Sequence, residues 1–324
     1  MDLNVFVSRR IPQTGLDLLR QHVDHVDVFD DEEPMNHERL VDASRDRDGL
    51  LIMGNDQIDA PVLAASSRLR VVSNLSVGYN NVDVTEATRR KIVVTNTPGV
   101  LTETNADMTW AVLLAVARRV GEAERFIRSG QWKGWAPTQL LGADVSGKTL
   151  GIFGAGRIGT AVAKRAVGFF MKTIYTARSD KPAMKALGAK PVSFDELLSQ
   201  SDFICVHVPL TPETRHAFGE REFRKMKPTA YFINMARGAV HDEVALARAL
   251  RERWIAGAGL DVYENEPQIA PELLEMPNVV LLPHLGSATT ETRTRMAVLA
   301  AENLLTVLRG EKCENVVNPE ALSR

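Results

Sequence analysis

The sequence predicts an α/β fold, built as two lobes that each contain a doubly wound parallel sheet. Short apolar runs rich in Val, Ile and Leu alternate with helical patterns along the whole chain, as in sheets whose parallel strands are buried on both faces. The chain also has 324 residues, 44% of them hydrophobic, which suits two lobes of ordinary size better than one small domain.

The first series of strands and helices fills the N-terminal part of the chain. Its five expected strands are Leu3–Val7, His25–Phe29, Gly49–Met53, Leu69–Ser73 and Ile92–Thr95. Asp83 and Glu86 have the spacing of a helix N-terminus, in which the first acid accepts hydrogen bonds from the first turn. This part contains no glycine-rich nucleotide fingerprint.

A second series of strands that alternate with helices begins at Thr149. Its expected strands are Thr149–Phe153, Thr173–Thr176, Asp202–Val208, Ala230–Asn234, Ile255–Leu260 and Val279–Leu282. Ser193 and Glu196 form a capping box, which predicts a helix that ends near Gln200. Strands that alternate with helices over this length predict a second doubly wound parallel sheet.

Two helical patterns are longer than the others, Glu103–Ser129 and Ala288–Leu308. They bracket the second series, so we expect them to cross between the lobes and the C-terminal segment to return to the first lobe. The substrate-binding domain would then be discontinuous, made of residues 1–98 and 289–324. The nucleotide-binding domain would be residues 99–288.

Composition argues against several classes of partner. A formal net charge of −2 gives no basic surface for nucleic acid and no polybasic membrane patch. The longest strongly apolar run, Trp110–Ala117, is far shorter than the roughly 20 residues of a membrane span. The N-terminus lacks the pattern of a secretory signal, and the two cysteines, Cys205 and Cys313, form neither a disulfide framework nor a metal-binding spacing. We therefore expect a cytoplasmic protein without a bound metal, in which Cys205 packs inside a strand.

A nucleotide fingerprint opens the second series. The segment Gly154-Ala155-Gly156-Arg157-Ile158-Gly159 matches G-x-G-x-x-G, directly after an expected strand and at the start of a helical pattern. The first Gly makes the turn, the second lets the backbone approach a pyrophosphate, and the third lets the helix pack closely. The alternative is a tight turn that binds nothing, but the strand and helix around it favour dinucleotide binding.

The end of the next strand predicts which dinucleotide binds. An NAD site has an acid there that accepts the ribose hydroxyls. Here the position is Ala177, and Arg178 and Ser179 follow, which can bind a 2′-phosphate. NADPH is therefore the expected cofactor. NADH stays possible, because Asp180 could reach the ribose and Arg178 could be a solvated loop residue.

Three polar residues follow three expected strands of the second series. Arg237 offers the planar fork that suits a 2-keto carboxylate, and His284 can act as a general acid. Glu266 is the carboxylate that would keep this imidazole protonated. Each residue alone could be structural. Together, after a nucleotide fingerprint, they predict reduction of a keto acid by hydride transfer.

At this point the chain resembles the D-isomer-specific 2-hydroxyacid dehydrogenase family along essentially its whole length. Within it, the similarity is to the glyoxylate/hydroxypyruvate reductase and 2-ketogluconate reductase branch. The matching motifs are Val77–Asp83, Leu101–Asp107, Gly154–Gly159, His207–Thr211, Asn234–Gly238, Gly259–Val262 and Pro283–Ser287. The resemblance implies a flavodoxin-like substrate lobe and a Rossmann nucleotide-binding lobe with the cleft between them.

The resemblance also implies roles for individual residues. Arg237, Glu266 and His284 would be catalytic. The backbone amides of Val77 and Gly78 would bind the substrate carboxylate together with Arg237 and His284. Besides the fingerprint, Arg178 and Ser179, the residues expected to line the cofactor groove are Thr104, His207, Val208, Pro209, Thr214, Met235, Ala236, Arg237, Asp261, His284 and Gly286.

Members of this family usually form homodimers through the nucleotide lobe. The irregular arm Gly130–Ser146, which contains Trp132 and Trp135, is the expected dimer contact. Two alternatives stay open: a dinucleotide-sensing corepressor of the same fold, or a related dehydrogenase for phosphoglycerate, lactate, formate or phosphite. The sequence leaves open whether the keto acid is glyoxylate, hydroxypyruvate or 2-ketogluconate.

Overall fold

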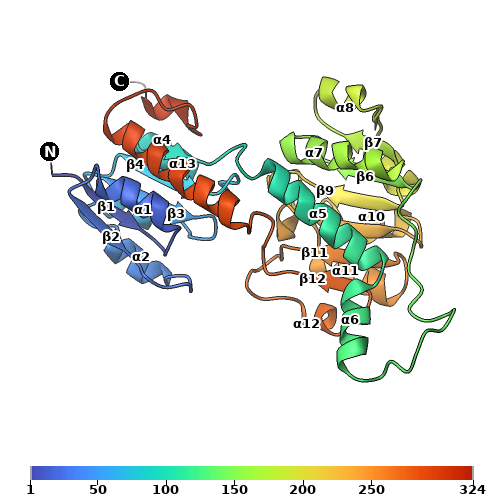
Figure 1. Cartoon of the computed structure of the whole chain (residues 1–324). Helices are drawn as coiled ribbons and strands as arrows, with labels where there is room; N and C mark the ends of the chain where they lie inside the picture. Colours follow the sequence, from blue (N-terminus) through green and yellow to red (C-terminus); the bar gives the residue numbers. More distant parts are fainter. Residues whose placement is uncertain (1, 323–324) are drawn as a thin grey trace. The chain divides into compact units, whose positions relative to one another are not determined.

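The computed structural model describes residues 2–322, which form two compact units. One unit contains residues 2–101 and 288–322, and the other contains residues 102–287. Each unit is an α/β layer structure around its own parallel sheet (Figure 1). This confirms the predicted fold class.

The first unit contains a five-stranded parallel sheet in the order β2-β1-β3-β4-β5. The strands are β1 Asn4–Val7, β2 His25–Val28, β3 Gly49–Met53, β4 Val71–Leu75 and β5 Val93–Thr95. The helices are α1 Gln13–Arg20, α2 His37–Ala43, α3 Ala60–Ala64, α4 Val84–Arg89 and α13 Thr290–Leu308, with a 3-10 turn at Pro319–Leu322. All five strands match predicted ones, although β4 begins two residues later than expected.

Helix α13 packs against α1 and strands β3, β4 and β5 of this unit. Helices α1 and α13 are in close contact at Gly15, where an added Cβ would lie 2.9 Å from the Cβ of Ala297 and 3.0 Å from its carbonyl oxygen. A side chain at residue 15 would therefore force the two helices apart. Two helices far apart in sequence are joined here because one position lacks a side chain.

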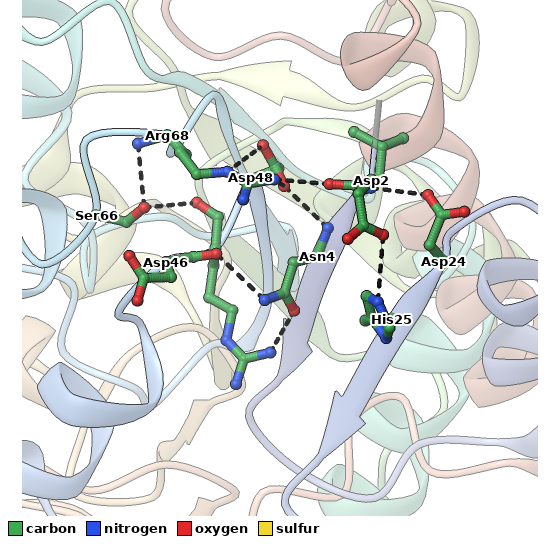
Figure 2. A network of polar contacts seen from close by, with 10 residues as sticks. Asp2, Asn4, Asp24, His25, Asp46, Asp48, Ser66 and Arg68 are labelled. Atoms are coloured by element: carbon green, nitrogen blue, oxygen red, sulfur yellow. Dashed lines mark hydrogen bonds and ion pairs between the residues drawn. The ribbon is translucent and has the colours of Figure 1, made fainter.

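A polar network closes the end of this sheet where the strands begin (Figure 2). The buried Asp48 accepts hydrogen bonds from the Asn4 backbone, 2.9 Å, and from both Nε and Nη2 of Arg68, at 3.2 and 2.6 Å. Arg68 also donates to the Asp2 carbonyl, 2.7 Å. These bonds satisfy main-chain groups at the starts of the strands, away from the carboxyl edge where α/β sheets bind ligands.

The second unit contains a seven-stranded parallel sheet in the order β12-β11-β10-β9-β6-β7-β8. Its strands are β6 Thr149–Phe153, β7 Lys172–Thr176, β8 Lys190–Pro191, β9 Phe203–Val206, β10 Tyr231–Asn234, β11 Gly257–Leu260 and β12 Val279–Leu281. Its helices are α5 Thr102–Ala117, α6 Val120–Arg128, α7 Arg157–Ala166, α8 Pro182–Ala186, α9 Phe194–Gln200, α10 Glu220–Lys225, α11 Glu243–Arg251 and α12 Pro271–Leu274, with 3-10 turns at Val167–Phe169 and Gly238–Val240. Six strands match predicted ones, and the short edge strand β8 was missed.

The expectation of one helix over Glu103–Ser129 is wrong. Arg119 adopts the left-handed conformation, with φ 55°, and separates α5 from α6. Its guanidinium binds the carboxylate of Glu122, 2.7 Å, which holds the break in place. The expectation that both long helices cross between the lobes is also wrong: α5 packs on α7, β10, β11 and β12, and α13 packs in the first unit.

Cys205 lies in the interior of the second unit. The side chain is fully buried on β9, between β6 and β10, and burial raises the pKa of its thiol far above the ordinary value. This confirms that Cys205 packs in a strand. No helix within residues 2–322 is long and apolar enough to cross a membrane.

The contact at Gly15 gives a testable prediction. Gly15→Ala is expected to lower the free energy of unfolding by about 1–3 kcal/mol, because the new Cβ overlaps Ala297 and outweighs the better helix propensity of Ala. The control is Thr14→Ala at the exposed neighbouring position of α1, which should be neutral or slightly stabilising. Urea unfolding followed by circular dichroism measures both, and a Gly15→Ala protein as stable as the control would contradict the packing argument.

Candidate functional site

The predicted residues of the second unit lie at one edge of its sheet. Gly154 follows β6, Arg237 follows β10 and His284 follows β12, in each case within a few residues of the carboxyl end of the strand. Because these strands are parallel, the loops that follow them gather at the same edge. The order of the sheet reverses at β6, which is where an α/β sheet binds a nucleotide.

The glycine turn after β6 has the geometry that a dinucleotide requires. Gly154 has φ +103°, and an added Cβ would lie 2.7 Å from the carbonyl oxygen of His207. Gly156 is the N-cap of α7, and nothing lies within 4 Å of the position that its Cβ would take. Gly159 packs so closely on Gly154 that a Cβ would lie 2.3 Å from its carbonyl oxygen. The open space in front of Gly156, at a helix N-terminus, fits a pyrophosphate.

The loop after β7 exposes Ala177, Arg178 and Ser179. Asp180 turns toward α8, where its carboxylate binds the Lys185 ammonium at 2.6 Å, and this hydrogen bond lowers its pKa. Asp180 is therefore neutralised within its own loop.

His284 and Glu266 form a hydrogen-bonded pair, with 2.9 Å between Nδ1 and Oε2. The other carboxylate oxygen of Glu266 accepts from the backbone N–H of Tyr263, 3.0 Å. Burial alone would raise the pKa of Glu266, but the bond to His284, the N–H of Tyr263 and the charge of Arg237 outweigh it and lower the pKa from its ordinary value. The carboxylate is thus ionised at neutral pH, and the imidazole, whose side chain is 49% exposed, can be reached by a ligand.

The turn that carries His284 is strained, and hydrogen bonds to the side chain of Asp261 hold it in place. His284 has φ 56°, a conformation that is uncommon for a residue with a side chain. The buried Asp261 accepts from the backbone N–H groups of Leu285, 2.6 Å, and Gly286, 2.7 Å. Burial, opposed by these bonds, raises the pKa of Asp261. Asp261 was predicted to line the cofactor groove, and the structure shows that it anchors this turn.

Arg237 lies in a loop that is fixed by hydrogen bonds from Asn234. The Asn234 amide accepts from the backbone of Ala236, 3.0 Å, and donates to the carbonyl of Arg237, 2.9 Å, and to Nδ1 of the buried His241, 3.0 Å. Burial lowers the pKa of Arg237, and the negative charge of Glu266 opposes this shift. Residue 238 must be Gly, because a Cβ there would lie 1.8 Å from the carbonyl carbon of Tyr263.

The other predicted cofactor residues lie along the same loops. The Thr214 hydroxyl donates to the Pro209 carbonyl, 2.7 Å, which closes the loop after β9. The ring of His207 is enclosed, and burial lowers its pKa to about 3, so it is neutral. The remaining predicted residues lie in the first turn of α5 and in the loops after β9, β10 and β12: Thr104, Val208, Met235, Ala236 and Gly286.

Val77 and Gly78 follow β4 in the first unit. Their carbonyls accept from the side-chain amides of Asn96, 2.8 Å, and Asn74, 2.9 Å. Because the N–H and C=O of a trans peptide point in opposite directions, the N–H of Gly78 points away from Asn96. The turn is therefore fixed with its carbonyls directed toward the side chains of Asn74 and Asn96.

Tyr263 is a residue of the site that the sequence analysis missed. Its backbone N–H binds Glu266, and its buried phenol donates to the carbonyl of Leu282, 2.9 Å, two residues before His284. Burial, together with the charges of nearby carboxylates including Asp261, raises the pKa of this phenol. Tyr263 therefore ties the loop of Glu266 to the strand end that carries His284. In the sequence, the only indication of this role was that Tyr263 lies two residues after Asp261, in the polar segment that follows β11.

A glycine turn that opens a helix, on the same sheet edge as a carboxylate–imidazole pair, defines a dinucleotide-dependent oxidoreductase. Comparison with known proteins agrees. Residues 110–286 match the family described as D-isomer specific 2-hydroxyacid dehydrogenase, NAD binding domain. The chain therefore belongs to the D-isomer specific 2-hydroxyacid dehydrogenase family, and its cofactor is a nicotinamide dinucleotide.

Individual relatives are similar over their whole length. The chain is 49% identical to the glyoxylate reductase of Thermococcus onnurineus and covers 98% of it, and 51% identical to that of Korarchaeum cryptofilum, again over 98%. These alignments cover 100% and 99% of this chain. The crystal structure of an NADPH-dependent glyoxylate/hydroxypyruvate reductase from Sinorhizobium meliloti, in complex with NADP and malonate, is 34% identical, with a TM-score of 0.89, and the match covers 100% of this chain and 99% of that one.

The hydrogen bond of the Tyr263 phenol is expected to stabilise the folded protein. Tyr263→Phe removes one buried hydrogen bond and leaves the Leu282 carbonyl without that donor, so we expect the protein to lose about 1–2 kcal/mol of stability. The control is Tyr79→Phe, at a position that is 45% exposed, which should lose much less. Chemical denaturation measures both, and equal losses would show that the buried bond contributes nothing specific.

Proposed function

We propose that this chain reduces a small 2-keto acid, glyoxylate or hydroxypyruvate, to the D-2-hydroxy acid and that NADPH is the preferred cofactor. The observation that carries the proposal is the His284–Glu266 hydrogen bond, which lies on the same sheet edge as Arg237 and the glycine turn. The names of the relatives support the substrate, since two of them are glyoxylate reductases and one is a glyoxylate/hydroxypyruvate reductase.

Proton transfer is the task of His284. Because Nδ1 binds Glu266, Nε2 is the ring atom that can donate a proton to the oxygen of the keto group as that oxygen gains negative charge. The ionised Glu266 stabilises the imidazolium form and fixes the plane of the ring. A reduced nicotinamide dinucleotide supplies the hydride when it is bound.

Substrate binding is the task of Arg237. A guanidinium can span the carboxylate and the neighbouring keto oxygen with two parallel N–H groups, which a lysine cannot do. Burial makes this charge interact more strongly with an anion than it would in water. The backbone amides of Val77 and Gly78 would bind the substrate carboxylate as an anion-binding turn.

The preference for NADPH rests on the loop after β7. No acid stands at residue 177, so no carboxylate there would accept the ribose hydroxyls or repel a 2′-phosphate. Arg178 and Ser179 are exposed, so a phosphate can reach them. The only nearby acid of the loop, Asp180, is paired with Lys185. These contacts favour the phosphorylated cofactor.

We also propose that the protein is a cytoplasmic homodimer whose arm at 130–146 contacts the partner. Trp132 is 51% exposed and Trp135 is 84% exposed, a large apolar surface for one irregular segment. Both cysteines are free thiols, which suits a reducing compartment. Sedimentation equilibrium measures the mass in solution, and a monomer would contradict the dimer.

Turnover of glyoxylate tests the proposed function. The parent protein with NADPH should reduce glyoxylate and hydroxypyruvate, with 2-ketogluconate as the third member of the panel. His284→Ala should lower kcat at least about a hundredfold, while NADPH binding measured by fluorescence stays nearly unchanged. A parent that binds NADPH without turnover would indicate a dinucleotide-sensing protein of the same fold.

The pH profile separates the roles of His284 and Glu266. Since the pKa of Glu266 is lowered from its ordinary value, the pair keeps its carboxylate charge through the neutral range and loses it only in acidic solution. On the alkaline side activity should fall when the imidazolium loses its proton. Glu266→Gln should move this alkaline fall to lower pH, because the stabilising charge is gone. An unmoved profile would remove Glu266 from the mechanism.

Cofactor preference is tested at the loop after β7. A charge-assisted contact between Arg178 and a phosphate corresponds to about ten- to hundredfold in preference, so kcat/KM should be higher with NADPH than with NADH by that ratio. Ala177→Asp combined with Arg178→Ala should reverse the order. Steady-state kinetics with both cofactors at saturating glyoxylate measures this. Equal efficiencies for the parent would show that Arg178 contributes nothing to binding.

A further inference from the structure

A buried carboxylate lies next to the reaction residues and has no part in the mechanism described so far. Glu243 is the first residue of α11 and is only 7% exposed. Its Oε1 accepts from the backbone N–H of Glu264, 2.5 Å, and its Oε2 accepts from the backbone N–H of Ala270, 3.1 Å. The two oxygens thus bind the two ends of one loop, residues 264–270.

The loop between these two bonds carries Glu266. Glu266 is two residues after the first bonded N–H and four residues before the second. Its own carboxylate binds Tyr263 on one side and His284 on the other. The position of the Glu266 carboxylate therefore depends on the path of a segment whose ends are both fixed by Glu243.

The chemistry of the side chain explains why a carboxylate occupies this position. A carboxylate has acceptor lone pairs on both oxygens, whereas a primary amide has one acceptor oxygen and an NH2 group that only donates. Only Asp or Glu can therefore accept from both ends of the loop. Helix α11, which carries Glu243, is well packed, because Leu246, Ala249 and Leu250 bury one of its faces in the core.

The charges around Glu243 are also arranged in favour of this contact. Its place in the first turn of α11 puts the carboxylate at the positive end of the helix dipole. The nearby carboxylate of Glu264 turns away to Nε2 of His216, 2.6 Å, and to Nη2 of Arg215, 3.1 Å. Glu264 thus contributes only its backbone to the contact with Glu243.

We propose that Glu243 is a positioning residue of the reduction: its carboxylate holds both ends of the 264–270 loop and so places Glu266 against His284. This inference rests on the proposed function of the His284–Glu266 pair. It predicts that loosening the loop lowers the rate of proton transfer but leaves the binding of the cofactor unchanged, since the glycine turn lies on another loop.

The test is Glu243→Gln in the full-length protein. The amide keeps the size of the side chain and can accept from only one end of the loop. We expect kcat for glyoxylate to fall about tenfold or more, because a displacement of about 1 Å in a reacting group can cost that much. The KM for NADPH should stay within about twofold of the parent.

Two further variants isolate the contact from charge and from folding. Asp242→Asn removes one negative charge at the adjacent residue and keeps the N-cap of α11, since Asn caps as well as Asp, so its kcat should stay within about twofold. Ala270→Pro removes the N–H that binds Oε2 without changing Glu243, and the φ of Ala270, −54°, suits proline. It should lower kcat as Glu243→Gln does.

Hydrogen exchange of the loop gives a readout that does not need turnover. Peptides that contain residues 264–270 should exchange faster in Glu243→Gln than in the parent or in Asp242→Asn. A folded Glu243→Gln protein with kcat within about twofold of the parent would overturn the proposal. If that variant does not fold, an unchanged kcat in Ala270→Pro would overturn it. A parent without turnover would instead contradict the proposed function, and exchange alone would then decide whether Glu243 holds the loop.

Discussion

The hydrogen bond between Nδ1 of His284 and Oε2 of Glu266 is the interaction on which the rest of the site depends. It fixes which ring nitrogen is free, the plane of the imidazole and the charge next to it. Neither partner lies on a regular element: each is in a loop several residues beyond the end of its strand. The bond therefore has the right geometry only if both loops are held in place by something more rigid.

Carboxylates that accept from backbone N–H groups provide that rigidity. Asp261 binds two N–H groups of the turn after His284, and Glu243 binds the two ends of the loop around Glu266. Charge-assisted bonds of this kind are stronger than bonds between neutral groups. The two bonds of Asp261 also hold the turn in which His284 has its left-handed conformation, a strain of order 1–3 kcal/mol.

The sequence predicted the sheets well because buried parallel strands leave a strong local pattern, and the edge strand Lys190–Pro191 was missed because it has no apolar run. The left-handed Arg119 broke a predicted helix without a glycine to indicate it. The supporting residues of the site were harder to find. Glu243 resembles an ordinary acid in a first helical turn, and its bonds to Glu264 and Ala270 join residues 21 and 27 positions away. Such contacts exist only after the strands are paired.

The same carboxylates would also repel the carboxylate of a keto acid, and Arg237 offsets this repulsion. The carboxylates of Asp261, Glu266 and Glu243 all contribute to the raised pKa of Tyr263, so the field at this edge is negative. A negative field stabilises an imidazolium, which favours proton donation, but it repels the carboxylate of a keto acid. Arg237 offsets this repulsion. Partial burial lowers the pKa of its guanidinium, and the charge of Glu266 counteracts this shift. Glu266 thus supports both cations of the site, the proton donor and the substrate anchor.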